Sequence, residues 1–123
     1  MSVEELLAAA RSRLTRLQPR EADEAVRAGA VIVDIRPDSQ RTPDGAVPHA
    51  LIIARNVLEW RCDPTSDARD PAVSDPRRRI IVMCDEGYQS SLAAATLLEL
   101  GLPLATDLIG GFQAWRRAGL EVR

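Results

Sequence analysis

Lysine is absent from this sequence of 123 residues, and all 16 basic side chains are arginines. Together with the many alanines, this indicates a GC-rich coding sequence more than a mechanism. An excess of charge is also lacking, because 18 acidic residues leave a net charge of −2. We therefore expect neither nucleic acid nor an anionic membrane surface as a partner. No run approaches the roughly 18 consecutive apolar residues of a membrane span, so we expect no membrane-crossing segment.

Metal-binding side chains are scarce. Two cysteines and one histidine are too few for a usual four-ligand zinc site, so no metal and no cofactor are expected. The first seventeen residues lack the uninterrupted apolar core of a signal peptide. We therefore expect a cytoplasmic protein whose two cysteines stay reduced. The charged residues that interrupt this segment are Glu4, Glu5, Arg11, Arg13 and Arg16.

Hydrophobic periodicity predicts alternating helices and strands in one domain, because the chain length matches a usual single domain. Apolar, β-branched runs predict strands over residues 31–36, 51–54, 80–83 and 105–109. Helices are expected over residues 2–17, 19–28, 90–100 and 112–118, with a helical turn over 56–61. Turn-forming residues occupy 37–48, and the polar, proline-containing stretch 62–79 is expected to be a surface loop. An N-terminal helix (1–17) thus precedes a core of residues 18–123.

Strands that alternate with helices favour an α/β fold with a mostly parallel sheet covered on both faces. In such sheets the ligand crevice lies at the carboxyl ends of the strands. Cys84 directly follows the expected strand 80–83 and therefore lies at such an end. This position makes Cys84 the first candidate for a functional residue.

The segment from Cys84 to Ser91 joins a buried strand to a helix. A short loop of this kind can turn several backbone N–H groups toward one point, which forms an anion cradle at the positive end of the helix. A thiol at the start of that cradle is stabilised as the nucleophilic thiolate. Gly87 permits the bend, and the hydroxyl of Ser90 or Ser91 can cap the helix or bind the anion. A buried cysteine that merely closes the strand is the alternative.

Four segments of the chain resemble motifs of the rhodanese-like family. The loop 84–90 matches the signature Cys-x-x-Gly-x-Arg-Ser except at Gln89. The similarity extends over residues 16–122. The other three segments are 31–36, which ends in Asp-x-Arg; 44–50, a loosely kept Gly-His-Ile-Pro-Gly-Ala turn; and 110–115, a Gly-Gly-aromatic-x-x-Trp segment.

The resemblance implies a small single-domain sulfurtransferase whose five-stranded, mostly parallel sheet is flanked by helices. It also implies that Cys84 is catalytic and carries sulfur as a persulfide between a donor and an acceptor. The expected partners are a small sulfur donor and a thiol acceptor or acceptor protein, for a monomer or homodimer. The loop residues expected to bind the substrate are Asp85, Glu86, Gly87, Tyr88, Gln89 and Ser90.

The loop departs from the family pattern in its charge. Gln89 replaces the usual arginine, and Asp85 and Glu86 add two carboxylates beside the nucleophile. The helix end favours the thiolate by about 0.3–2 kcal/mol, whereas a nearby carboxylate opposes it by roughly 0.6–2.4 kcal/mol. We therefore expect thiosulfate, a small dianion, to be a weak donor and a persulfide to be preferred.

Positive charge that compensates the acidic pair is expected from arginines outside the loop. Arg61 and then Arg55 follow the second expected strand, in a stretch that borders the active-site mouth in this fold. Arg36 is a third candidate, although it and Asp34 are expected first of all to form an ion pair at the strand end. Cys62 is a candidate for resolving the persulfide as a disulfide.

Two other functions are left open by the sequence. A catalytically quiet module that presents the loop to a partner protein is favoured by Gln89 and the acidic pair, but the retained Cys84 opposes it. A cysteine phosphatase requires Cys, five residues and Arg, because the guanidinium clamps the phosphoryl group. Ser90 occupies that arginine position, which disfavours phosphatase chemistry.

Overall fold

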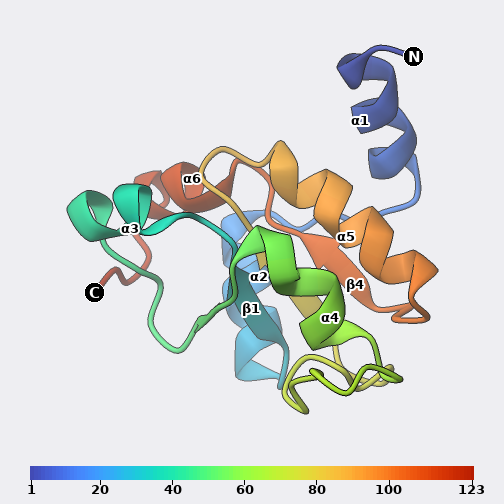
Figure 1. Cartoon of the computed structure of the whole chain (residues 1–123). Coiled ribbons are helices and arrows are strands. Elements are labelled where there is room, and N and C mark those ends of the chain that lie inside the picture. The colour runs from blue at the N-terminus through green and yellow to red at the C-terminus, as the bar shows by residue number, and fades with distance from the viewer.

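Four parallel strands form one sheet in the order β2-β1-β3-β4, in a computed structural model that describes residues 1–123 (Figure 1). The strands are β1 (Val31–Asp34), β2 (Leu51–Ile52), β3 (Ile80–Met83) and β4 (Ala105–Asp107). In the centre of the sheet Val31 is paired with Ile80, and Ile80 with Ala105. All strands run in one direction, so their carboxyl ends meet at one edge.

The helices are α1 (Val3–Ser12), α2 (Pro19–Arg27), α3 (Asp38–Asp44), α4 (Leu58–Cys62), α5 (Gln89–Glu99) and α6 (Gly111–Arg117), with a 3-10 turn, η1, at Arg55–Val57. Helices α2, α5 and α6 of the structure lie within one residue of the expected helices 19–28, 90–100 and 112–118. The α/β class and the sheet with helices on both faces are therefore confirmed. The short helix α3 was not expected, because its segment contains the turn formers Asp38, Ser39, Pro43 and Asp44.

Each face of the sheet carries its own hydrophobic core. Val33 and Val82 belong to the core beneath α4 and α5, whereas Ile32 and Ile81 belong to the core beneath α2 and α6. This alternation follows from the two-residue period of a strand. Burial on both faces explains why β1 and β3 are continuous apolar runs.

The expected fifth strand is replaced by a single bridge. Leu17 donates its N–H to the oxygen of Asp107 at 3.1 Å and accepts from the N–H of Ile109 at 2.8 Å. The extended segment available for pairing lies between Ser12, where α1 ends, and Pro19, where α2 begins. The N–H groups of Arg13 and Leu14 still bond back to Ala10 and Arg11, so only the residues just before Pro19 are left to pair with the sheet. The same pairing corrects the N-terminal helix, which ends at Ser12 and not at residue 17.

Helix α1 packs against α5 on the outside of the molecule (Figure 1). Its N-terminus is fixed by a capping box, in which the hydroxyl of Ser2 accepts from the N–H of Glu5 at 3.0 Å. The packing against α5 holds α1 beside the carboxyl edge of the sheet. None of the helices combines the length and the apolar character needed to cross a bilayer.

Candidate active site

Cys84 follows the last residue of β3 at the carboxyl edge of the sheet, as expected. Its side chain reaches the surface only slightly, with 8% of the residue exposed. The loop from Cys84 to Tyr88 then leads into α5, which begins at Gln89. Cys84 therefore lies at the start of a loop that ends in a helix N-terminus.

Two backbone N–H groups converge on the sulfur of Cys84. Gly87 donates to Sγ at 3.2 Å, and Ser90 donates at 3.4 Å. The N–H of Ser90 belongs to the first turn of α5, where amides lack a partner within the helix. Gly87 has a φ of 88°, which only glycine adopts without strain. The predicted cradle is present, and it is centred on the sulfur.

The carbonyl groups of the loop are held away from the sulfur by hydrogen bonds to other elements. The oxygen of Cys84 accepts from the N–H of Phe112 at 2.9 Å, and that of Asp85 accepts from Gln113 at 3.1 Å. The oxygen of Gly87 accepts hydrogen bonds from Arg11 and Arg16 on the side of α1. When the carbonyl oxygens of the loop point away from the sulfur, its N–H groups are left to point toward it. These contacts therefore favour an arrangement that stabilises negative charge on Sγ.

The turn Gly110-Gly111 allows α6 to approach the loop this closely. A Cβ atom on Gly111 would lie 2.5 Å from the oxygen of Cys84 and 2.7 Å from that of Asp85. Both separations are shorter than real contacts of this kind, so the position requires glycine. Phe112 and Trp115 anchor α6 in the core, as their burial shows. The Gly-Gly-aromatic segment therefore supports the active-site loop.

Two arginines from the N-terminal segment bind the loop from outside. Arg11 in α1 donates to the oxygen of Gly87 at 2.7 Å and to the hydroxyl of Ser91 at 3.1 Å. Arg16 donates to the same oxygen of Gly87 at 3.1 Å. No local pattern in the sequence indicates these contacts, because Arg11 and Gly87 are 76 positions apart. Positive charge thus reaches the loop from α1.

The serine hydroxyls of α5 point to a buried carboxylate and not to a ligand. Ser90 donates to Asp107 at 2.7 Å and Ser91 donates at 2.8 Å. Arg16 completes the group with an ion pair of 2.8 Å to Asp107. The prediction that a serine hydroxyl binds the anion or caps α5 is therefore corrected. Ser90 contributes its backbone N–H, while its hydroxyl fixes the start of α5.

A cavity of about 380 Å³ opens beside Cys84. Among the expected site residues, Arg36 lines it together with the loop side chains. Gly87 contributes its backbone N–H, whereas Arg55 and Arg61 are not in the lining. The cavity is lined by Ile35, Arg36, Pro37, Gln40, Cys84, Asp85, Glu86, Tyr88 and Gln89.

Arg36 is held rigidly at the end of β1. Its Nη2 donates to Asp34 at 2.8 Å and to the oxygen of Gly45 at 2.8 Å, which confirms the expected strand-end ion pair. Its guanidinium lies 3.9 Å from the centre of the Phe112 ring. Its Nη1 is buried and has no hydrogen-bond partner within the chain.

The acidic pair of the loop is divided between two environments. Asp85 is partly buried and accepts a hydrogen bond of 2.9 Å from the amide of Gln113. Glu86 is exposed at the cavity. Neither carboxylate forms an ion pair within the chain, so no arginine is paired with them beside Cys84.

The expectation that Arg61 and Arg55 hold an anionic donor is not supported by their positions. Arg61 donates to the oxygen of Ala68 at 3.0 Å, and Arg55 forms an ion pair of 2.8 Å with Glu59. Both guanidinium groups bond within their own segment, although the Nε of Arg55 is buried without a partner, and neither residue lines the Cys84 cavity. The physical reason is local: Glu59 lies one helical turn after Arg55.

Cys62 is unsuited to resolve a persulfide. It is fully buried in the core beneath α4 and α5. Burial, and then the charges of Glu59 and Asp70, raise the pKa of its thiol from 9.0 to about 12. A thiolate is the attacking species in disulfide formation. Cys62 is therefore a core residue.

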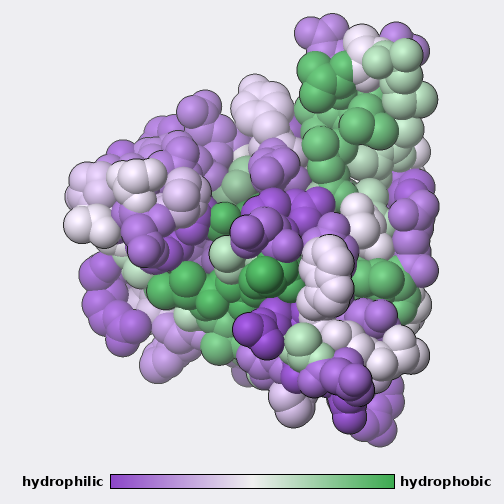
Figure 2. Space-filling model, viewed as in Figure 1, coloured by the Kyte–Doolittle hydropathy of each residue, from purple (hydrophilic) through white to green (hydrophobic).

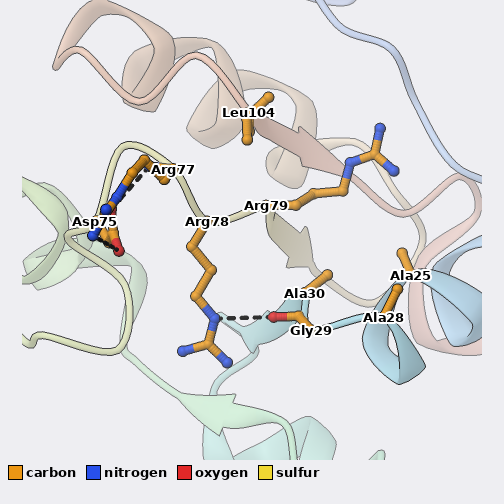
Figure 3. Close-up of a pocket in the computed structure, with 9 residues that line it drawn as sticks. All are labelled: Ala25, Ala28, Gly29, Ala30, Asp75, Arg77, Arg78, Arg79 and Leu104. Atoms are coloured by element: carbon orange, nitrogen blue, oxygen red, sulfur yellow. Dashed lines mark hydrogen bonds and ion pairs between the residues drawn. The ribbon is translucent and has the colours of Figure 1, made fainter.

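A larger cavity, of about 560 Å³, lies at the opposite, amino end of the strands (Figure 3). Arg77, Arg78 and Arg79 line it, and Arg78 donates to the oxygen of Gly29 at 3.2 Å. Arg77 is paired with Asp75 at 3.2 Å. No cysteine, serine or histidine lines this cavity, so the nucleophile and its cradle mark the smaller cavity as the candidate active site.

The sequence of the chain is similar to proteins of one known family. Residues 18–118 match the family model described as the rhodanese-like domain. The thiosulfate sulfurtransferase GlpE of Stutzerimonas stutzeri is 34% identical over 101 residues, which cover 82% of this chain and 84% of that protein.

Solved structures share the fold. A protein of unknown function from Rhodopseudomonas palustris, described as a possible tyrosine phosphatase, matches with a TM-score of 0.91 at 31% identity, over 100% of this chain and 95% of that one. A thiosulfate sulfurtransferase from Pseudomonas aeruginosa matches with a TM-score of 0.78 at 24% identity, over 98% of this chain and 22% of that one. From the family model and these relatives, we conclude that the chain belongs to the rhodanese-like domain family.

Proposed function

We propose that this protein is a sulfurtransferase in which Cys84 accepts a sulfane sulfur and passes it to a thiol. The observation that carries the proposal is the convergence of the N–H groups of Gly87 and Ser90 on Sγ. Hydrogen bonds to a charged acceptor are stronger than those to a neutral one. The cradle therefore favours the thiolate that attacks and the anionic persulfide that results.

The reaction divides into two displacements. The thiolate of Cys84 attacks the sulfane sulfur of the donor, the bond from that sulfur to the rest of the donor breaks, and the leaving group keeps the electron pair. An acceptor thiolate then attacks the outer sulfur of the persulfide, and the electron pair of the broken S–S bond returns to Cys84. Covalent catalysis of this kind replaces one difficult transfer by two easier ones.

The charges around the cavity favour a persulfide donor over thiosulfate. Asp85 and Glu86 line the cavity, and Gln89 adds no charge where the family signature has an arginine. The guanidinium of Arg36 is already paired with the buried Asp34. A dianion meets two carboxylates here, at a cost of roughly 0.6–2.4 kcal/mol for each pair of unit charges.

In this proposal Arg36 binds the donor through its Nη1, which has no hydrogen-bond partner within the chain. An unsatisfied buried donor costs about 1–3 kcal/mol, so an acceptor that reaches it is favoured by a similar amount. The Nη1 of Arg36 is such a donor on a residue that lines the cavity, but the Arg36 side chain has no exposed surface, so a ligand reaches Nη1 only when the side chains around it move. We assign it to the anionic end of the donor, in place of Arg55 and Arg61.

Intact-mass spectrometry tests the proposal. The wild type, Cys84→Ser and the matched control Cys62→Ala are incubated with glutathione persulfide or with thiosulfate. We expect the mass of one added sulfur in the wild type and in Cys62→Ala, its absence in Cys84→Ser, and its loss when a thiol is added. A clear preference for thiosulfate would contradict the proposed donor class.

A quiet interaction module is the second candidate, and the acidic loop favours it. If neither donor adds sulfur to a folded protein whose Cys84 still reacts with iodoacetamide, this second function is supported. Phosphatase activity is disfavoured, since residues 85–91 contain no arginine. A generic aryl phosphate should therefore be left intact by the protein.

A further inference from the structure

A second hollow lies next to the Cys84 cavity, between α1 and the start of α5. It has a volume of about 410 Å³. In Figure 2 hydrophobic residues gather on the flank of α1, and the surface is hollowed between this helix and the rest of the molecule. We call this hollow the α1 groove. It is lined by Val3, Glu4, Leu7, Tyr88, Gln89 and Leu92.

The apolar side chains of the α1 groove are not needed by the protein core. Leu7 and Leu92 are partly buried, yet neither belongs to the two core clusters or to the residues packed against them. Val3 and Tyr88 are exposed by 69% and 60%. Apolar surface that gathers in a hollow rather than in a core is typical of a ligand site.

The α1 groove adjoins the active-site cavity. Tyr88 and Gln89 line both the groove and the cavity that contains Cys84. Tyr88 is held in place from the side of α1, because the guanidinium of Arg11 lies 5.5 Å from the centre of its ring. Both residues are exposed, so a molecule that places a sulfur at Cys84 would reach the groove by crossing the surface of Tyr88 and Gln89.

We propose that the α1 groove is a substrate subsite that binds the apolar carbon group of a small organic thiol or its persulfide, a proposal that rests on the sulfurtransferase function above. Glu4 in the groove and Glu86 at the cavity repel an anionic substrate. The carbon group that the groove favours is therefore an uncharged or cationic alkyl or aryl group.

The size of the α1 groove favours a small molecule over a protein. Small-molecule pockets enclose roughly 300–1,000 Å³, and the groove falls in this range. A protein partner needs about 800 Å² of contact on each side. Six residues line the groove, whereas such an interface takes roughly 20–30 residues per side.

The first experiment measures discharge of the Cys84 persulfide. The protein is loaded with glutathione persulfide, and intact mass then follows the loss of sulfur to ethanethiol, butanethiol or hexanethiol. These acceptors differ in chain length and not in the chemistry of the thiol. The acceptor thiolate bonds to the outer sulfur, the S–S bond to Cys84 breaks, and the electron pair returns to Cys84.

We expect the second-order rate constant to rise with chain length. Full burial of a methylene group favours binding about fourfold, and a half-open groove is expected to give about twofold. Hexanethiol should therefore accept sulfur at least about tenfold faster than ethanethiol. In Leu7→Gln this advantage should fall to about threefold or less.

Two further variants make the result specific. Val3→Gln also places an amide in the groove, at an exposed position that carries little packing, so it keeps the test valid if Leu7→Gln unfolds. Leu6→Gln is the matched control, because Leu6 is a neighbouring exposed leucine of α1 that does not line the groove. The control should keep the wild-type dependence on chain length.

Equal rates for all three thiols in the wild type would overturn the proposal, as would transfer to a protein acceptor with no effect of chain length.

A second reaction separates failure of the subsite from failure of the proposed function. Alkyl methanethiosulfonates need only the Cys84 thiolate, which bonds to their sulfenyl sulfur as methanesulfinate leaves. If Cys84 never accepts sulfur from the donor, the sulfurtransferase proposal fails, while the subsite still predicts faster modification by the hexyl than by the ethyl reagent. Equal rates with both reagents would overturn the subsite itself.

Discussion

The guanidinium of Arg11 donates a hydrogen bond of 2.7 Å to the carbonyl oxygen of Gly87, and so connects α1 to the loop that holds the nucleophile. The N–H of Gly87 donates to the sulfur of Cys84. The family signature has an arginine at the position of Gln89, inside the loop, whereas here arginine side chains reach the loop from the N-terminal segment. α1 therefore belongs to the machinery of the site.

We predict that Arg11→Gln slows alkylation of Cys84 by iodoacetamide about threefold to tenfold at neutral pH. The variant loses a hydrogen bond from a charged donor, worth about 1.5–3 kcal/mol, and Arg16 retains part of the support. The rate is measured by intact mass, and a urea titration confirms that the protein is folded. Arg13→Gln is the control, because Arg13 is an exposed residue whose nearest ionic partner is Glu99 at 3.7 Å. Equal rates in the two variants would show that α1 does not tune the nucleophile.

The contact between α6 and the loop depends on Gly111. A methyl group there would lie 2.5 Å from the oxygen of Cys84, so we predict that Gly111→Ala lowers the free energy of unfolding by about 3 kcal/mol or more. Gly119→Ala is the matched control: its φ of 77° is also positive, but nothing lies within 4 Å of the added atom. We expect a cost of about 1 kcal/mol for the control, from backbone strain alone. Urea denaturation of both variants measures the difference, and equal costs would refute the close approach.

Much of the site could be predicted from the sequence because its parts are local. Cys84 and the amides that bind it lie within seven consecutive residues, and Asp34 and Arg36 are two positions apart. The contacts of Arg11 and Arg16 were missed because nothing near them in the chain indicates a partner more than 70 positions away.

Two further differences from the sequence-based prediction have tertiary causes. The helical periodicity of residues 2–17 is overridden at Leu17, which pairs with β4 instead of continuing α1. The hydroxyls of Ser90 and Ser91 are bound by Asp107, a residue that only the packing of β4 against α5 brings near them. Periodicity and motif spacing describe neighbours along the chain, so neither feature could be derived from them.

Cys62 and Cys84 should differ sharply in reactivity. With a pKa of about 12, Cys62 stays protonated at neutral pH, and its burial blocks reagents. We predict that iodoacetamide modifies Cys84 alone in the folded protein and both cysteines in urea, as read by peptide mass mapping. Modification of Cys62 in the folded protein at a rate like that of Cys84 would contradict its burial.

The same pKa predicts how stability changes with pH. Below about pH 8 the Cys62 thiol is mostly neutral in both the folded and the unfolded chain, because the ordinary pKa of the thiol is 9.0. Between about pH 9 and 12 the unfolded chain loses this proton first, so the free energy of unfolding falls as pH rises, by up to about 4 kcal/mol. In Cys62→Ala the fall should be smaller over this range. Parallel pH profiles of the two proteins would show that Cys62 is not the cause.

Gln89 is the position where restoring the family signature should change the choice of donor. It lines the cavity beside Asp85 and Glu86, so an arginine there opposes the charge of the acidic pair. A unit charge pair near a protein surface is worth on the order of 1–4 kcal/mol before screening by salt. We therefore predict that Gln89→Arg raises the rate of sulfur uptake from thiosulfate about tenfold, relative to uptake from glutathione persulfide in the same protein.

Gln89→Glu should change this ratio in the opposite direction, and added salt should reduce both effects. A donor ratio that is the same in the wild type and both variants would mean that charge at this position does not select the donor, and that the acidic loop serves contact with a partner protein instead.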